Sequence, residues 1–105
     1  LATATLPDNA YSHVYAAERH FQQQDYPRAL REIEKATRIS IDRTLSVGHL
    51  VPAVAQAYLL RGQIFAELGD FEAARGELTV AISLGDSKTR AEASALLVAL
   101  LSQLN

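Results

Sequence analysis

Cysteine, methionine and tryptophan are all absent from the 105 residues of this sequence. Without cysteine the chain can form no disulfide, thiolate-bound zinc site, iron–sulfur cluster or thiol nucleophile, and without methionine it has no thioether haem ligand. The lack of cysteine leaves the redox compartment undetermined, so cytoplasm and periplasm both remain open. Because the sequence begins at Leu1 and not at an initiator methionine, we expect a processed product or a segment of a longer protein.

The sequence also lacks an excess of charge of one sign and any long apolar run. Ten Lys and Arg stand against twelve Asp and Glu, for a formal net charge of −2. Nucleic-acid binding needs a concentrated positive field, so we expect no nucleic-acid partner. The longest apolar run, Ala95 to Leu101, is far shorter than the ~18 residues of a membrane-spanning helix. The composition therefore predicts one small soluble domain, and its richness in alanine and arginine is typical of bacterial GC-rich genes.

Proline and glycine are sparse, with three and five residues respectively. Between them the apolar residues recur at spacings of three and four, which is typical of helices and not of strands. We predict an all-α fold of five helices joined by short turns, with consecutive helices antiparallel. Gly69 is expected to end the third helix in a left-handed conformation. The expected helices run over residues 9–24, 27–44, 52–68, 70–84 and 87–103.

The sequence aligns with itself at a shift of 45 residues. The turn Gln24-Asp25-Tyr26 matches Gly69-Asp70-Phe71, and the apolar positions that follow match in the pairs Ala29 with Ala74, Ile33 with Leu78, Ala36 with Ala81 and Ile39 with Leu84. This pattern predicts a helix–turn–helix unit used twice, in which an aromatic residue after the turn wedges between two helices. Small residues then allow the helices to approach closely.

These positions resemble the tetratricopeptide repeat (TPR), whose small residues in the first helix would be Ala17 and Gly62. The resemblance implies an α-solenoid of antiparallel helical hairpins. On this basis we divide the chain into a lead-in, a first TPR-like repeat, an extended inter-repeat segment, a second TPR-like repeat and a C-terminal capping or packing helix: 1–9, 10–43, 44–54, 55–86 and 87–105. The period of 45 is longer than that of the family, with the extra residues between Thr44 and Val54.

The resemblance also implies a function, because TPR proteins bind extended peptides or helices in a concave groove. It predicts an adaptor or scaffold module for a protein or peptide partner, with no cofactor. The family's groove positions fall on Tyr11, Val14, Glu18, Phe21, Gln22, Gln56, Leu59, Gln63, Ala66 and Glu67. The family's carboxylate clamp is absent, since Val14 and Glu18 replace its Lys and Asn. The predicted groove is mildly acidic and rich in amides, suited to a polar or basic segment, unless these are ordinary solvent-facing residues.

Catalytic and metal-binding motifs are absent from the sequence, which contains no HExxH, GxSxG or glycine-rich phosphate loop. His13 and His20 have no third ligand at a suitable spacing, and His20 is expected to be half-buried. Glu32 and Glu34 point to different sides of a helix and cannot act as an acid–base pair. We therefore predict no catalytic residue, no metal site and no enzyme activity.

One group of basic residues and one single arginine admit more than one interpretation. Arg28, Arg31, Lys35 and Arg38 fall on one side of the second helix, either as a solvated outer face or as a docking strip for an acidic partner. Arg61 falls among apolar positions of the third helix. It either extends past the edge of the core or pairs with a carboxylate.

The last helix carries two apolar faces. One is made of small residues, at Ala91, Ala95, Val98 and Ala99, and the other, broader one includes Ala93 and several leucines. Because one face is enough to cover the fourth helix, we predict that the leucine-rich face packs against a second copy or further repeats of a parent chain. The expected self-association residues are Leu96, Leu97, Leu100, Leu101 and Leu104. The second functional hypothesis is therefore a self-assembly or regulatory domain. In the alternative packing, both faces of this helix meet the core of the same chain, and no face is left for self-association.

Overall fold

A computed structural model describes residues 10–44 and 51–104, with the side chains of 39–44, 51 and 104 outside the described set. Within these residues the chain forms five helices and no strand, which confirms the predicted all-α fold. They are α2 (Ala10–Gln22), α3 (Tyr26–Thr44), α4 (Val51–Glu67), α5 (Phe71–Leu84) and α6 (Ser87–Leu104). The predicted lead-in 1–9 and most of the predicted segment 44–54 lie outside the described residues.

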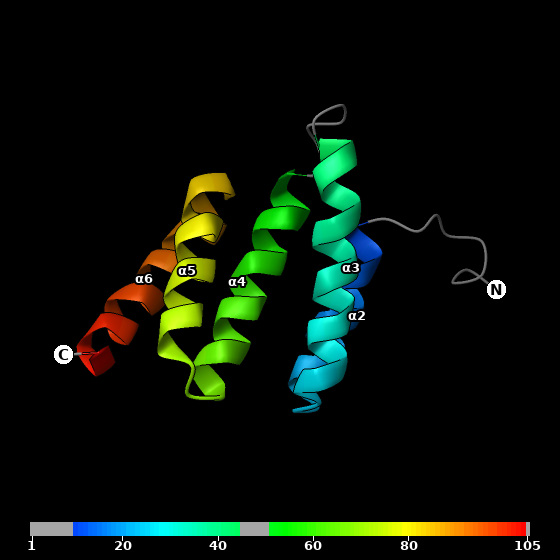
Figure 1. Ribbon diagram of the computed structural model, residues 1–105. Coiled ribbons are helices and arrows are strands. Elements are labelled where there is room, and N and C mark those ends of the chain that lie inside the picture. Colours follow the sequence, from blue (N-terminus) through cyan, green and yellow to red (C-terminus); the bar gives the residue numbers. More distant parts are fainter. Residues whose placement is uncertain (1–9, 45–50, 105) are drawn as a thin grey trace.

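Helix α4 is the centre of the arrangement. Helices α3, α4 and α5 lie side by side, α2 lies behind α3, and α6 begins behind α5 and extends to the left (Figure 1). Each helix packs against the next one along the chain, and in addition α2 contacts α4 and α4 contacts α6. Since α4 touches all four other helices, its side chains connect the two ends of the molecule.

The turns α2–α3 and α4–α5 have the same backbone geometry. The amide of Asp25 donates to the carbonyl of His20 at 2.8 Å, and the amide of Asp70 donates to the carbonyl of Phe65 at 2.9 Å. These two bonds are related by the 45-residue shift that aligns the sequence with itself. Gly69 has φ +84°, as predicted for a left-handed helix end. Gln24, its counterpart in the first turn, has φ +60°.

An aspartate caps the N-terminus of each of the three helices that follow a described turn. The carboxylates of Asp25, Asp70 and Asp86 accept from the amides three residues further on, at 3.5, 3.3 and 2.9 Å. A side-chain acceptor at this position satisfies an amide that has no partner within the helix. The bond from the amide of Thr89 holds the pKa of Asp86 below its ordinary value.

The core consists of two clusters that share α4. One joins α2, α3 and α4 through small residues and two isoleucines, and the other joins α4, α5 and α6. Ile33 and its repeat counterpart Leu78 are among the most deeply buried side chains. Gly62 is buried, and a Cβ there would lie 2.9 Å from the side chain of Leu78, so glycine allows α4 and α5 their close approach.

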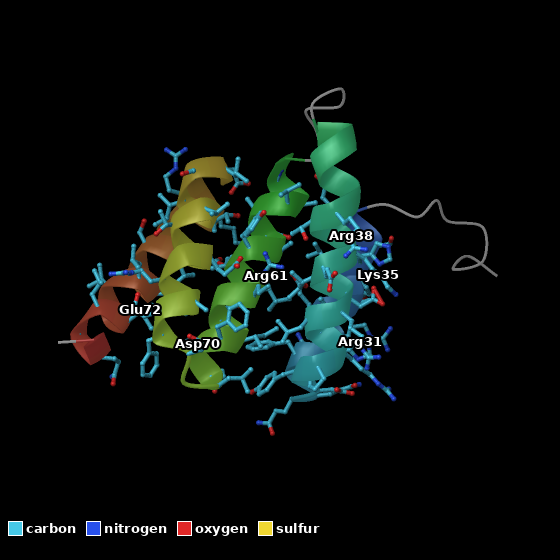
Figure 2. All side chains as sticks on the ribbon, in the orientation of Figure 1. Arg31, Lys35, Arg38, Arg61, Asp70 and Glu72 are labelled. Carbon is cyan, nitrogen blue, oxygen red and sulfur yellow. The ribbon has the colours of Figure 1, made fainter. Side chains whose placement is uncertain are left out.

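Arg61 pairs with a carboxylate, one of the two arrangements expected for it. Its Nε lies 3.0 Å from Oε2 of Glu77 on α5, and both side chains are largely buried. The contact lacks hydrogen-bond alignment and is therefore an ion pair. The guanidinium also lies over the ring of Tyr58, 5.2 Å from its centroid. In Figure 2 Arg61 lies on the central helix α4.

The structure corrects the expectation for α6, because the leucine-rich face turns inward. Leu100 is only 5% exposed, and it belongs with the half-buried Leu96 and Leu97 to the core shared with α4 and α5. The small-residue face is turned to solvent, where Val98 is 70% exposed, and Leu101 at its margin is 40% exposed. The side chain of the last expected self-association residue, Leu104, lies outside the described set. The larger aliphatic side chains face inward because they cover more of the apolar surface of α4 and α5.

Candidate partner-binding groove

Helices α2, α4 and α6, which alternate with α3 and α5 along the chain, line a hollow of about 220 Å³. We call it the acidic hollow. Helix α2 contributes its C-terminal half, α4 its middle and α6 its second turn. The lining residues are Glu18, Phe21, Gln22, Gln56, Leu59, Leu60, Gln63 and Glu92. The structure thus brings together six of the ten predicted groove residues: Glu18, Phe21, Gln22, Gln56, Leu59 and Gln63.

The other four predicted groove residues lie elsewhere: Ala66 lines a second hollow, and Tyr11, Val14 and Glu67 line neither. Val14 is only 3% exposed and belongs to the core of α2, α3 and α4, so its prediction as a groove residue is corrected. It is buried because an apolar side chain on that side of α2 meets α3 and α4. Tyr11 and Glu67 are exposed but do not line the acidic hollow.

Glu92 is a functional candidate that sequence reasoning missed. It is exposed on α6, and it enters the acidic hollow because α6 packs against α4. The self-alignment ends before this helix, so no repeat position pointed to Glu92. An acidic residue between two apolar faces was the available signal.

The acidic hollow combines a polar rim with an apolar floor. Leu59 and Leu60 are almost fully buried, while the two carboxylates and two of the three amides are exposed. Carboxylates accept hydrogen bonds, and the amides both donate and accept. Such a rim can hold a basic side chain and can satisfy the backbone groups of a bound segment.

A second hollow of about 340 Å³ lies between α4, α5 and the C-terminal half of α6. We call it the apolar hollow, since its only polar side chains are those of Gln63 and Gln103. Its lining residues are Gly62, Gln63, Ala66, Phe71, Leu78, Leu96, Ala99, Leu100 and Gln103. Gln63 lines both hollows, so the two are neighbours, and together we call them the groove.

The basic strip, made of Arg28, Arg31, Lys35 and Arg38, runs along α3, and Figure 2 shows Arg31, Lys35 and Arg38 on that helix. Arg28 pairs with Asp25 at 3.4 Å, Lys35 with Glu32 at 3.5 Å, and Arg38 with Glu34. These local pairs agree with a solvated outer face. His20 is half-buried, as expected, and lines a shallow depression with Arg28, Arg31, Glu32 and Lys35.

Glu32 also joins α3 to α2. Its Oε2 lies 2.6 Å from Nδ1 of His13, and both side chains are mostly buried. Burial alone would raise the pKa of Glu32, but the His13 hydrogen bond and the charge of Lys35 outweigh burial and hold this pKa below its ordinary value. The pair therefore stabilises the packing of the first two described helices.

In residues 10–44 and 51–104 no group of three or more His, Asp or Glu side chains could hold a metal ion. None of the helices there has the length and apolar character needed to span a bilayer. Comparison with protein-family models, curated proteins and solved structures finds no match to this chain.

Proposed function

We propose that this chain is a protein–protein interaction module of the tetratricopeptide type, an adaptor or scaffold that binds a peptide or helix of a partner in the groove. The observation that carries the proposal is the acidic hollow. Six residues chosen as groove positions from the family resemblance come together there from α2 and α4, which are separated by α3 in the chain. The role requires no cofactor and no reaction.

The packing of alternate helices supports the same proposal. In a stack of helical hairpins the first helix of each unit contacts the first helix of the next. Contacts of α2 with α4 and of α4 with α6 agree with this scheme, as do the matched hydrogen bonds of the two turns. In this arrangement α2, α4 and α6 form the layer that faces the partner.

The proposal is tested by selecting random dodecapeptides displayed on phage against the chain. We expect enriched peptides that bind the wild type and bind Glu18→Arg with Gln63→Ala about tenfold more weakly. A reversed charge and a lost amide together remove roughly 1.4 kcal/mol of binding free energy. Circular dichroism should show an unchanged helical signal, since both side chains lie at the surface of the groove. Peptides that bind the double variant as well as the wild type, or no enrichment above a blank surface, would refute the proposal.

A second candidate function is self-assembly through the outer face of α6. It is favoured by the exposure of Val98 and Leu101, 70% and 40%, on a face that otherwise carries alanine and serine. Sedimentation velocity at tens of micromolar tests it, with Val98→Lys and Leu101→Lys as variants and Thr79→Lys on α5 as the control. This candidate predicts a dimer that only the two α6 substitutions dissociate. A monomer at all concentrations excludes it.

A further inference from the structure

We infer that the segment bound in the groove carries a basic side chain for the acidic hollow and a large apolar side chain for the apolar hollow. The two side chains should be about three residues apart in an extended segment, or about seven apart in a helical one. This inference rests on the proposed function and specifies the chemistry of the partner. Three observations support it: the two hollows are neighbours along α6, the apolar hollow arises from a difference between the two repeats, and the acidic hollow has two carboxylates that are unpaired within the described residues.

The two hollows follow one line along α6. Glu92 lines the acidic hollow, and Leu96, Ala99 and Gln103 line the apolar one. These residues recur at intervals of four, three and four, so they occupy one face of the helix over three turns. On α4 the two hollows meet at Gln63. A ligand lying along this face of α6 therefore meets first the acidic and then the apolar hollow.

Helix geometry sets the spacing of the ligand's side chains. From Glu92 to Ala99 is seven residues, about 10 Å along the axis at 1.5 Å per residue. An extended peptide advances about 3.3 Å per residue, so about three residues cover that length. A helical ligand parallel to α6 covers it with seven.

The apolar hollow exists because the two repeats differ at one position. In the first, Phe21 packs against Tyr26, with ring centroids 5.8 Å apart. The 45-residue shift places Ala66 and Phe71 at the corresponding positions, and both line the apolar hollow. The aromatic side chain that fills the space in the first repeat is thus replaced by a methyl group in the second. The space left beside Phe71 is open at the groove and suits a large apolar side chain from a partner.

The acidic hollow has two carboxylates and no cation of its own. Within the described residues neither Glu18 nor Glu92 has a Lys or Arg at ion-pair distance, and none of the lining residues is basic. By contrast, Glu32, Glu34, Glu72 and Glu77 are all paired with cations. Two carboxylates that face one hollow favour a positively charged occupant.

The two hollows should contribute unequally to affinity. Burial of a leucine-sized side chain contributes about 10- to 100-fold. An exposed ion pair contributes at most about fivefold for each carboxylate and weakens with salt. The apolar residue is therefore expected to provide most of the affinity, and the basic residue to provide direction and salt dependence.

Synthetic dodecapeptides of alanine, serine and glutamine with one arginine and one leucine test this directly. They are titrated into the ¹⁵N-labelled chain, with the arginine–leucine separation varied from one to eight residues and the orientation reversed. We expect the tightest binding at a separation of about three or about seven. Replacement of the leucine by serine should weaken binding about 10- to 100-fold. Replacement of the arginine by glutamine should weaken it about two- to tenfold and reduce the salt dependence.

Protein variants assign each side chain to its hollow. Ala66→Phe places an aromatic side chain where the first repeat has Phe21, and it should fill the apolar hollow. Replacing the peptide's leucine should then no longer weaken binding, while replacing its arginine still should. Ala95→Phe, on the outer face of α6, is the control. If Ala66→Phe does not fold, Ala99→Leu serves, since Ala99 is exposed where it lines the apolar hollow. Glu92→Lys should abolish the effect of the arginine, with Glu72→Lys on α5 as the control of equal charge change.

Each outcome decides between the inference and the proposed function. Groove binding that does not depend on the arginine, the leucine or their separation overturns the inference and leaves the proposed function in place. The same holds if replacing the peptide's leucine still weakens its binding to a variant in which the apolar hollow is filled. If selected phage peptides ignore Glu18→Arg with Gln63→Ala, the proposed function itself fails, whatever their composition.

Discussion

Gln24 adopts a backbone conformation that suits glycine better than glutamine. Its φ is +60°, and its counterpart in the second turn is Gly69. A residue with a Cβ is strained by about 1–2 kcal/mol in this conformation. Glycine relieves that strain, but it also increases the conformational entropy of the unfolded chain, which offsets part of the gain in stability. We predict that Gln24→Gly raises the free energy of unfolding by about 0.5–1 kcal/mol in urea denaturation. Gln23→Gly is the control, and a loss of stability in Gln24→Gly would contradict the assigned turn geometry.

The Arg61–Glu77 pair belongs to the core and not to the groove. Neither residue lines the acidic or the apolar hollow, and removal of one partner leaves the other charge largely buried. We predict that Arg61→Met and Glu77→Gln each lower stability by about 1–3 kcal/mol, and that the double variant loses less than their sum. Thermal and urea denaturation of all four proteins measures this coupling. A coupling near zero, or lost peptide binding at unchanged stability, would contradict the structural role.

The Glu32 carboxylate makes stability depend on pH in the acidic range. Its pKa is lower in the folded chain than the ordinary value of about 4.3, so its contribution is complete above that value. The contribution is lost as pH falls through the lowered folded pKa. We predict that Glu32→Gln flattens the decrease in melting temperature between about pH 5 and pH 3. Glu67→Gln, at an exposed position, is the control; equal slopes in wild type and Glu32→Gln would contradict the prediction.

At the scale of elements, the two faces of α6 should differ sharply in their effect on stability. Leu100 is almost fully buried and Val98 is 70% exposed. We predict that Leu100→Ala lowers the free energy of unfolding by about 2–4 kcal/mol and that Val98→Ala changes it by less than about 0.5 kcal/mol. Chemical denaturation measures both changes. A larger loss of stability in Val98→Ala than in Leu100→Ala would contradict this orientation and support the one predicted from the sequence.

The helices themselves could be predicted from the sequence, because local signals set their ends. Asp25, Asp70 and Asp86 each precede a helix and cap it, and Gly69 ends one. The rotation of α6 could not be predicted in the same way. Both of its faces are apolar, so periodicity alone does not decide which one is buried. Its orientation depends on the area available on α4 and α5, which is a tertiary property.

At the scale of the whole molecule, half of the groove could be predicted and half could not. The resemblance to the tetratricopeptide repeat placed groove positions on α2 and α4, so residues such as Glu18 and Gln63 were identified. The contribution of α6, including Glu92, depends on the packing of a helix that lies outside the alignment. The apolar hollow arises where the two repeats differ, at Phe21 and Ala66. It was missed because the self-alignment identifies positions that match and not positions that differ.

The central claim is that α2, α4 and α6 together form the surface that binds a partner segment. Amide chemical-shift mapping of the ¹⁵N-labelled chain, titrated with a peptide selected from the phage library, tests it most directly. The account predicts shifts that cluster on Gln56, Gln63 and Glu92 and spread to Leu96 and Ala99. Shifts confined to the outer sides of α3 and α5, or scattered over the chain without saturation, would contradict it.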